Sequence, residues 1–205
     1  MMRLVLASKS PARLALLRQA GLTPEVIVSE VDESAIVEPH PARLPMLLAS
    51  AKGHDVAARI AGDAVLIACD TVLEFEGRVH GKPGTPEAAA ALWRRMRGQE
   101  GVVHTGHFVW VRSGGTQRQD ARLGTTMVRF VDLDDAEIDA YVATGEPQRV
   151  AGGFTIDGRG GAYITAVTGD HFNVSGLSLP LFRQMVIDLG IDWPSLWATG
   201  SAAAG

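Results

Sequence analysis

The feature that most constrains the fold is an uninterrupted apolar run at residues 64–69, Ala-Val-Leu-Ile-Ala-Cys. Short runs of this kind are typical of strands that are buried inside a sheet. A second apolar run, at residues 3–7, has the same character. We therefore expect a sheet covered by other elements, as in proteins that combine strands with helices.

The run at residues 3–7 leads directly into signals for a helix. Ser10 is a good N-cap residue, and Pro11 suits the first helical position. Leu14 and Leu17 follow at helical spacing, and Gly21 stands where a helix end favours glycine. The chain is therefore predicted to open with a strand, a tight loop and a helix.

The rest of the chain continues this alternation and then changes to an antiparallel block. Further strands are expected at 26–28, 64–69, 72–75, 78–80, 102–111, 125–131 and 162–167. Further helices are expected at 41–61, 86–97, 134–143 and 179–189. Because no repeat or linker divides the chain, we predict a single α/β domain with a mixed sheet over residues 1–200, followed by a loose tail at 201–205.

The composition argues against several classes of protein. The 205 residues carry a formal net charge of -4, which gives no support for a basic face that binds duplex nucleic acid. Cys69 is the only cysteine, so no intrachain disulfide can form, which suits a reducing compartment. No apolar run has the length of a signal peptide or a membrane span. We expect a cytoplasmic protein without nucleic-acid or membrane partners, although converging Lys and Arg side chains would still let it hold a polyphosphate.

The loop after the first strand has the residue types of a phosphate site. A helix N-terminus offers free N–H groups and the positive end of the helix dipole. The hydroxyl groups of Ser8 and Ser10 can donate to phosphate oxygens, and Arg13 can bind two oxygens at once. The alternative is an ordinary helix cap with a surface arginine.

Two acidic positions are candidates for metal binding and catalysis. Asp70 and Thr71 directly follow the run at 64–69, and we expect Asp70 at the end of that strand, where α/β proteins place ligands. Glu33, beside Asp32, lies in another connection between a strand and a helix. Carboxylates of this kind suit Mg²⁺, which takes one or two of them plus substrate phosphates. The alternative is that Asp70 caps a turn and that Glu33 is solvated.

Two lysines have positions that favour a role in binding. Lys52 interrupts the apolar face of the helix predicted at 41–61. Lys82 stands between Gly81 and Pro83, where a restricted backbone would help to aim its ammonium group. For either lysine the alternative is a solvated surface charge.

Other candidate sites are weaker. His104 and His107 lie in a predicted strand, where side chains three residues apart point to opposite faces and cannot form a metal pair. Cys69 is interpreted as a core residue. The glycine-rich segment 151–158 would let backbone approach a ligand, but it has neither the P-loop nor the dinucleotide-binding motif.

Taken together, these motifs resemble the Maf family of nucleotide pyrophosphatases. The resemblance runs from Leu4 to Gly190. Its motifs occur here, in order, as L-V-L-A-S-K-S-P-A-R from Leu4, D-E from Asp32, Lys52, D-T from Asp70, G-K-P from Gly81, T-G from Thr105, the block from Gly145 to Gly158, and N-V-S-G-L from Asn173.

The resemblance implies an elongated twisted sheet flanked by helices, with a deep cleft between two lobes. It implies attack of water between the α and β phosphates of a nucleoside triphosphate, with a divalent cation such as Mg²⁺, Mn²⁺ or Co²⁺. Asp70 would accept the proton or orient the water through the metal, and Glu33 would help to bind that metal. The triphosphate would be held by Ser8, Arg13, Lys52 and Lys82. Such a reaction needs charge stabilisation more than covalent help.

The chain departs from the family pattern at three positions. Ala12 replaces an arginine, Asp157 replaces a glutamine, and Gly101 stands at a usual histidine. In the family, the positions of Ala12, Thr71 and Asp157 are associated with selection of the base. Thr71 fits the common pattern and the other two do not, so the resemblance does not supply the preferred base.

Two further functions stay open at this level. One is a nucleotide-binding regulator of cell division with little turnover. The other is a hydrolase for deaminated purines, which shares the chemistry and differs only in the base pocket. Long strands with free edges also leave a homodimer open.

Overall fold

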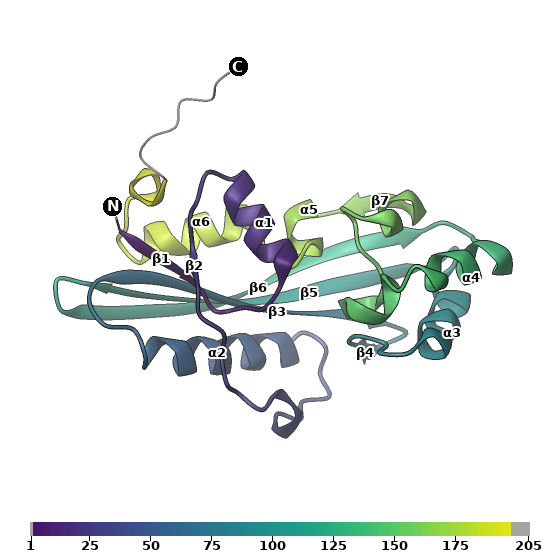
Figure 1. Ribbon diagram of the computed structural model, residues 1–205, viewed down its shortest axis with the longest axis horizontal. Helices are drawn as coiled ribbons and strands as arrows, with labels where there is room; N and C mark the ends of the chain where they lie inside the picture. The colour runs from purple at the N-terminus through teal and green to yellow at the C-terminus, as the bar shows by residue number, and fades with distance from the viewer. Residues whose placement is uncertain (1, 198–205) are drawn as a thin grey trace, which may run out of the picture.

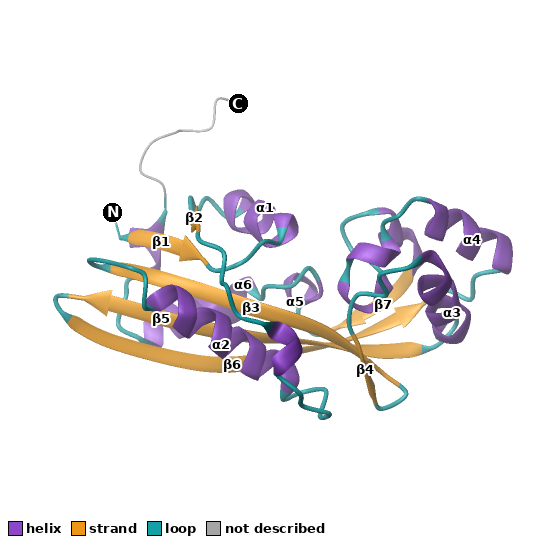
Figure 2. Cartoon of the chain, turned by 60° about the horizontal axis from the view of Figure 1, so that its bottom comes forward, coloured by secondary structure: helices purple, strands orange, loops and turns teal. Residues whose placement is uncertain are grey.

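The computed structural model describes residues 2–197 and shows an elongated, twisted sheet with helices on both faces (Figures 1 and 2). Within these residues the strand order is β2-β1-β3-β5-β6-β7, and β4 pairs with β3. The strands are β1 (Arg3–Leu6), β2 (Glu25–Val26), β3 (Ala64–Phe75), β4 (Arg78–His80), β5 (Glu100–Ser113), β6 (Thr116–Phe130) and β7 (Ile164–Thr168). Only β1 makes parallel pairs, with β2 and β3. The predicted mixed α/β fold is confirmed; the predicted tail at 201–205 lies outside the described residues.

The expectation that the buried strand ends before Asp70 is wrong. Strand β3 is 12 residues long, and Asp70 and Thr71 pair with Gly106 and Thr105 of β5. The ladder continues through these polar residues because the neighbouring strand satisfies their backbone groups. Asp70 therefore lies in the middle of the sheet and not at the end of a strand.

Strand β6 is also longer than predicted, since it begins at Thr116 and not at 125. Most of its first residues, 116–124, are polar and none is buried, so they lack the apolar alternation that marks a half-buried strand. They are nevertheless in register with β5 through the turn at 113–115. Consequently β3, β5 and β6 run together along the length of the molecule (Figure 2).

Helices divide the molecule into two lobes that share these long strands. At one end, α1 (Pro11–Gln19) and α6 (Leu179–Asp188) cover one face of the sheet, and α2 (Leu44–Ala57) covers the other (Figure 1). At the other end lie α3 (Pro86–Met96) and α4 (Asp135–Ala143) (Figure 1). Each lobe has its own apolar core, and that of the second contains Trp93 and Phe130. The short helix α5 (His171–Val174) lies against β5 and β6.

Two glycines allow α2 to approach the sheet closely. A Cβ atom on Gly106 would overlap the backbone of Pro45, and one on Gly53 would overlap the ring of Phe108. This packing brings Lys52 of α2 to Asp70 of β3. Within residues 2–197, no helix combines the length and apolar character that crossing a membrane requires.

Candidate active site

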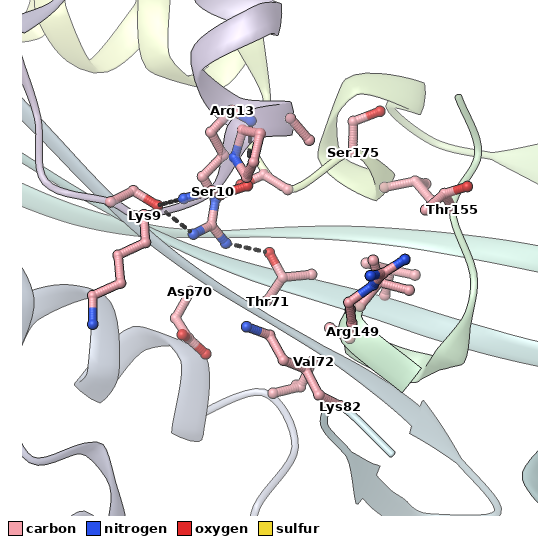
Figure 3. Close-up of a pocket in the computed structure, with 18 of the residues that line it drawn as sticks. Lys9, Ser10, Arg13, Asp70, Thr71, Val72, Lys82, Arg149, Thr155 and Ser175 are labelled. Atoms are coloured by element: carbon pink, nitrogen blue, oxygen red, sulfur yellow. Dashed lines mark hydrogen bonds between the residues drawn. The ribbon is translucent and has the colours of Figure 1, made fainter. Parts of the chain in front are cut away.

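A cleft lined by both lobes lies over the middle of β3 (Figure 3). Its volume is about 380 Å³, within the range of small-molecule sites, which is about 300–1,000 Å³. All of the site residues named from the sequence line it, namely Ser8, Ala12, Arg13, Glu33, Lys52, Asp70, Thr71, Lys82 and Asp157. Segments that are distant in the sequence therefore meet in one place.

The loop between β1 and α1 forms one wall of the cleft. Ser10 caps α1 by accepting a hydrogen bond from the backbone N–H of Arg13, and Pro11 occupies the first turn, as the sequence predicts. The hydroxyl oxygen of Ser8 accepts hydrogen bonds from the Ser10 backbone N–H and from Arg13 Nη1, both at 3.1 Å. Ala12, in the same first turn, also lines the cleft.

Arg13 spans the cleft wall between three partners. Besides Ser8, its Nε donates to the carbonyl oxygen of Gly176 at 2.7 Å, and its Nη2 donates to Thr71 Oγ1 at 2.9 Å (Figure 3). These contacts exclude the alternative of a surface arginine.

Lys52 and Asp70 form a largely buried ion pair at the floor of the cleft. Lys52 Nζ lies 2.6 Å from Asp70 Oδ1 and 3.0 Å from Glu33 Oε2, and the Lys52 and Asp70 side chains are 10% and 14% exposed. Glu33, in the short helix η1 (Glu33–Ala35), is more than half exposed. The alternatives of a solvated Lys52 and a turn-capping Asp70 therefore do not hold.

The environment of Asp70 favours proton acceptance. Burial raises the pKa of the Asp70 carboxyl, and the charges of Lys52 and Arg13 reduce this rise without cancelling it. A carboxylate with a raised pKa is a stronger base than an exposed one.

Lys82 enters the cleft from the loop after β4. Its ammonium group points toward the space beside Asp70 and Thr71 (Figure 3). The loop is fixed to the segment that follows α4: Gly152 N–H donates to the Gly81 carbonyl at 2.9 Å, and Gly84 N–H donates to Gln148 at 3.0 Å.

The opposite wall is formed by residues 149–157, which include Arg149, Thr155 and Asp157. One carboxylate organises this wall. Glu146 accepts hydrogen bonds from the hydroxyls of Tyr141 and Thr155 and from the backbone N–H groups of residues 159 and 160, at 2.6–3.1 Å. Burial alone would raise the pKa of Glu146, but these four donors outweigh it and hold the pKa below its ordinary value.

Basic residues gather in the cleft although the chain as a whole is acidic. The charged lining residues are Lys9, Arg13, Lys52, Lys82 and Arg149 against Glu33, Asp70 and Asp157. The excess of positive charge suits a polyphosphate.

Asp70 and Glu33 are the residues that fit a divalent cation. Their carboxylates come from different elements and converge on one point, where Lys52 now lies. In residues 2–197, no group of three or more His, Cys, Asp or Glu side chains could hold a metal ion. A pair of carboxylates suits a cation such as Mg²⁺, which takes one or two carboxylates from the protein.

The two histidines of β5 have separate structural roles. His104 contacts Glu74 and Thr125. His107 Nε2 accepts the Ser178 backbone N–H at 2.8 Å, so its proton is on Nδ1 and is donated to the Thr105 carbonyl. Cys69 is fully buried in the core, as predicted.

Sequence reasoning did not single out Glu146, Arg149 or Thr155 on one wall, nor Thr105 and Asn173 beneath the other. Glu146 stands inside the Gly145–Gly158 motif, and Thr105 inside the T-G motif. The signal available in the sequence was a glycine beside each polar residue, Gly145 beside Glu146 and Gly106 beside Thr105.

Comparisons with known proteins identify a family and several relatives that are similar to this chain. A comparison with protein families matches residues 3–189 to Maf-like protein. A relative from Cutibacterium acnes, named nucleoside triphosphate pyrophosphatase, is 51% identical over 94% of this chain and 93% of its own. A relative from Streptomyces coelicolor with the same name is 53% identical over 96% and 95%. The solved Ham1 protein of Staphylococcus aureus is 16% identical, with a TM-score of 0.38 over 63% of this chain and 72% of that one.

The family match covers nearly the whole chain, and both relatives are about half identical to it over almost their full lengths. The chain belongs to the Maf family.

Proposed function

We propose that this protein is a nucleoside triphosphate pyrophosphatase that hydrolyses the bond between the α and β phosphates, giving a nucleoside monophosphate and pyrophosphate. The observation that carries the proposal is the convergence of a buried carboxylate, Asp70, with Arg13, Lys52 and Lys82 in one cleft. The relatives that are about half identical to this chain are named for that activity.

In the proposed reaction, Asp70 accepts a proton from the attacking water. The water oxygen forms a bond to the α phosphorus, the bond from that phosphorus to the bridging oxygen breaks, and its electron pair leaves with pyrophosphate. Arg13, Lys52 and Lys82 balance the negative charge that develops on the phosphate oxygens. Ser8 contributes by holding Arg13 Nη1.

We propose that Asp70 and Glu33 hold a divalent cation, Mg²⁺, Mn²⁺ or Co²⁺, when substrate is bound. A cation there would supply positive charge to the triphosphate and lower the pKa of a bound water. Lys52 supports the same pair of carboxylates from the side of α2.

The base is proposed to lie against the wall that carries Asp157, with Ala12 on the facing wall and Thr71 between them. An ionised Asp157 accepts hydrogen bonds but cannot donate them. We therefore propose that this position favours bases that offer an amino group or a ring N–H. The small side chain of Ala12 leaves space where an arginine would stand.

We also propose that residues 1–200 act as one domain in the cytoplasm, where its nucleotide substrates are. A homodimer stays a prediction. In the described part of the chain, residues 116–126 of β6 pair with β5 on one side and have no partner strand on the other.

The test is pyrophosphate release from a panel of natural, methylated and deaminated nucleoside triphosphates, each with Mg²⁺, Mn²⁺ and Co²⁺. We expect metal-dependent release of one pyrophosphate per monophosphate, strongest for one class of base. Binding of nucleotide without release under any of these conditions would contradict the proposal and favour a binding-only regulator. Release of inorganic phosphate in place of pyrophosphate would contradict the proposed bond.

A further inference from the structure

The guanidinium group of Arg13 is held in one orientation. Three of its five N–H groups are donated to Gly176, Ser8 and Thr71. Within residues 2–197, the other two, one on each Nη, have no protein acceptor. These two N–H groups are the ones available to a phosphate in the cleft.

The hydroxyl of Thr71 belongs to a chain of hydrogen bonds, and the structure determines which group donates in each of them. Thr105 Oγ1 donates to the backbone carbonyl of Asn173 at 3.0 Å, and a carbonyl can only accept. Thr105 has then used its one hydroxyl proton. Its 3.0 Å contact with Thr71 Oγ1 must therefore be donated by Thr71. Thr71 in turn accepts from Arg13, which has only donors.

The end of this hydrogen-bond chain at Asn173 is held in place by further contacts. Asn173 of α5 is fully buried, and its Nδ2 donates to the Val103 carbonyl and to Thr126 Oγ1, both at 3.2 Å. A Cβ atom on Gly124 would overlap the Asn173 side-chain oxygen, so a larger residue there would require the Asn173 side chain to shift. Thr105 is also fully buried. The hydroxyl chain therefore runs from α5, which packs on β5 and β6 on the same face of the sheet as α1, to the wall of the cleft (Figure 1).

We propose that Thr105 is a positioning residue for phosphate binding. It makes Thr71 an acceptor that points its oxygen at Arg13 and its proton into the protein. Arg13 is thereby set with its two remaining N–H groups toward the substrate, and Thr71 does not donate to the substrate. The inference deepens the proposed function and rests on it for the identity of the ligand.

Thr105→Val removes the hydroxyl with little change in shape, and Thr105→Ser restores it. The control for loss of the α5 anchor is Thr126→Val: Thr126 is a buried threonine on β6 that donates to the Asp170 carbonyl and accepts from Asn173, but it has no hydrogen bond to Thr105, Thr71 or Arg13. For each protein we would measure thermal unfolding, kcat and KM for the best nucleotide of the panel, and binding of inorganic pyrophosphate by calorimetry.

We expect Thr105→Val to weaken pyrophosphate binding and raise KM by about tenfold, the usual scale for a misplaced charged donor. Thr105→Ser and Thr126→Val should bind pyrophosphate within about twofold of the wild type, even where Thr126→Val unfolds at a lower temperature. Thr71→Val interrupts the same chain, so the double variant Thr71→Val/Thr105→Val should be no worse than either single variant.

Equal pyrophosphate binding by Thr105→Val and wild type would overturn the inference. So would an equal loss in Thr126→Val, which would mean that Thr105 acts only by anchoring α5. A wild type that binds pyrophosphate but releases none from nucleotides would contradict the proposed function, and calorimetry of the variants would still decide the role of Thr105.

Discussion

The two walls of the cleft are built differently. The phosphate wall comes from regular elements: Asp70 and Thr71 from the middle of β3, Lys52 from α2 and Arg13 from α1. The base wall comes from irregular chain between α4 and β7, with the short turns η2 (Pro147–Arg149), η3 (Ala151–Gly153) and η4 (Arg159–Tyr163).

The source of rigidity also differs between the walls. The phosphate wall is supported by backbone ladders and by neutral buried groups such as Thr105 and His107. The base wall is supported by one ionised carboxylate, Glu146, which gathers four donors. The comparison teaches that Asp70, Lys52 and Arg13 stand on regular elements that tolerate little change, while Asp157 stands on a loop that can vary.

The largest effect should come from the phosphate wall. Asp70→Asn removes the proton acceptor without changing the shape of the side chain, so we expect turnover to fall about a thousandfold. Nucleotide affinity, measured by calorimetry, should change by less than about tenfold because the cations remain. Glu74→Gln, on the same strand outside the cleft, is the control. Turnover of Asp70→Asn at the wild-type rate would show that Asp70 is not the proton acceptor.

A second prediction concerns the pH dependence of stability, which should differ between the groups that support the two walls. Burial lowers the pKa of His107 to about 4, from 6.5. Between these values the unfolded chain binds a proton that the native protein does not, so stability is full above pH 6.5 and falls toward pH 4. The shift corresponds to about 3 kcal/mol of unfolding free energy.

Urea unfolding at pH 7, 6 and 5 would measure this loss, and His107→Gln should show a shallower decline than wild type. Burial also lowers the pKa of His80, so His80 contributes to the same decline, and His80→Gln must be measured beside His107→Gln. A decline as steep in His107→Gln as in wild type would show that other groups cause it.

A third prediction concerns the base wall. Glu146→Gln presents an amide N–H₂ to groups that are themselves donors, so the loop should loosen and KM should rise by about tenfold, with kcat changed by less than about threefold. Because the pKa of Glu146 is lowered, its contribution to stability is present above pH 4.5 and lost below, a window lower than that of His107. Glu137→Gln, on the exposed face of α4, is the control. A fall in kcat alone would show that Glu146 acts on the phosphate wall.

The smallest effect should be in selectivity. Asp157→Gln restores the ability to donate a hydrogen bond, so the ratio of kcat/KM between two bases should shift by about threefold, while kcat for the best substrate stays similar. Steady-state kinetics on the nucleotide panel measures this ratio. Identical profiles for Asp157→Gln and wild type would place base selection elsewhere.

The features that depend on residues close together in the chain could be predicted from the sequence. The apolar run at 64–69, the Ser10 cap and the order of strands and helices predicted the fold class, and the family resemblance named the residues that line the cleft. It did not reveal that β3 continues through Asp70, because pairing with β5 depends on a strand more than thirty residues away and not on local apolarity. Thr105 was missed for the same reason, since its partner Asn173 is 68 residues further along the chain.

The three long strands that cross the cleft have a consequence for how a nucleotide is admitted. Because β3, β5 and β6 pass without interruption from one lobe to the other, a change in the angle between the lobes would require the three paired strands to bend together. We therefore expect the shared sheet to set the width of the cleft, and the loops on either side to make any adjustment to a bound nucleotide.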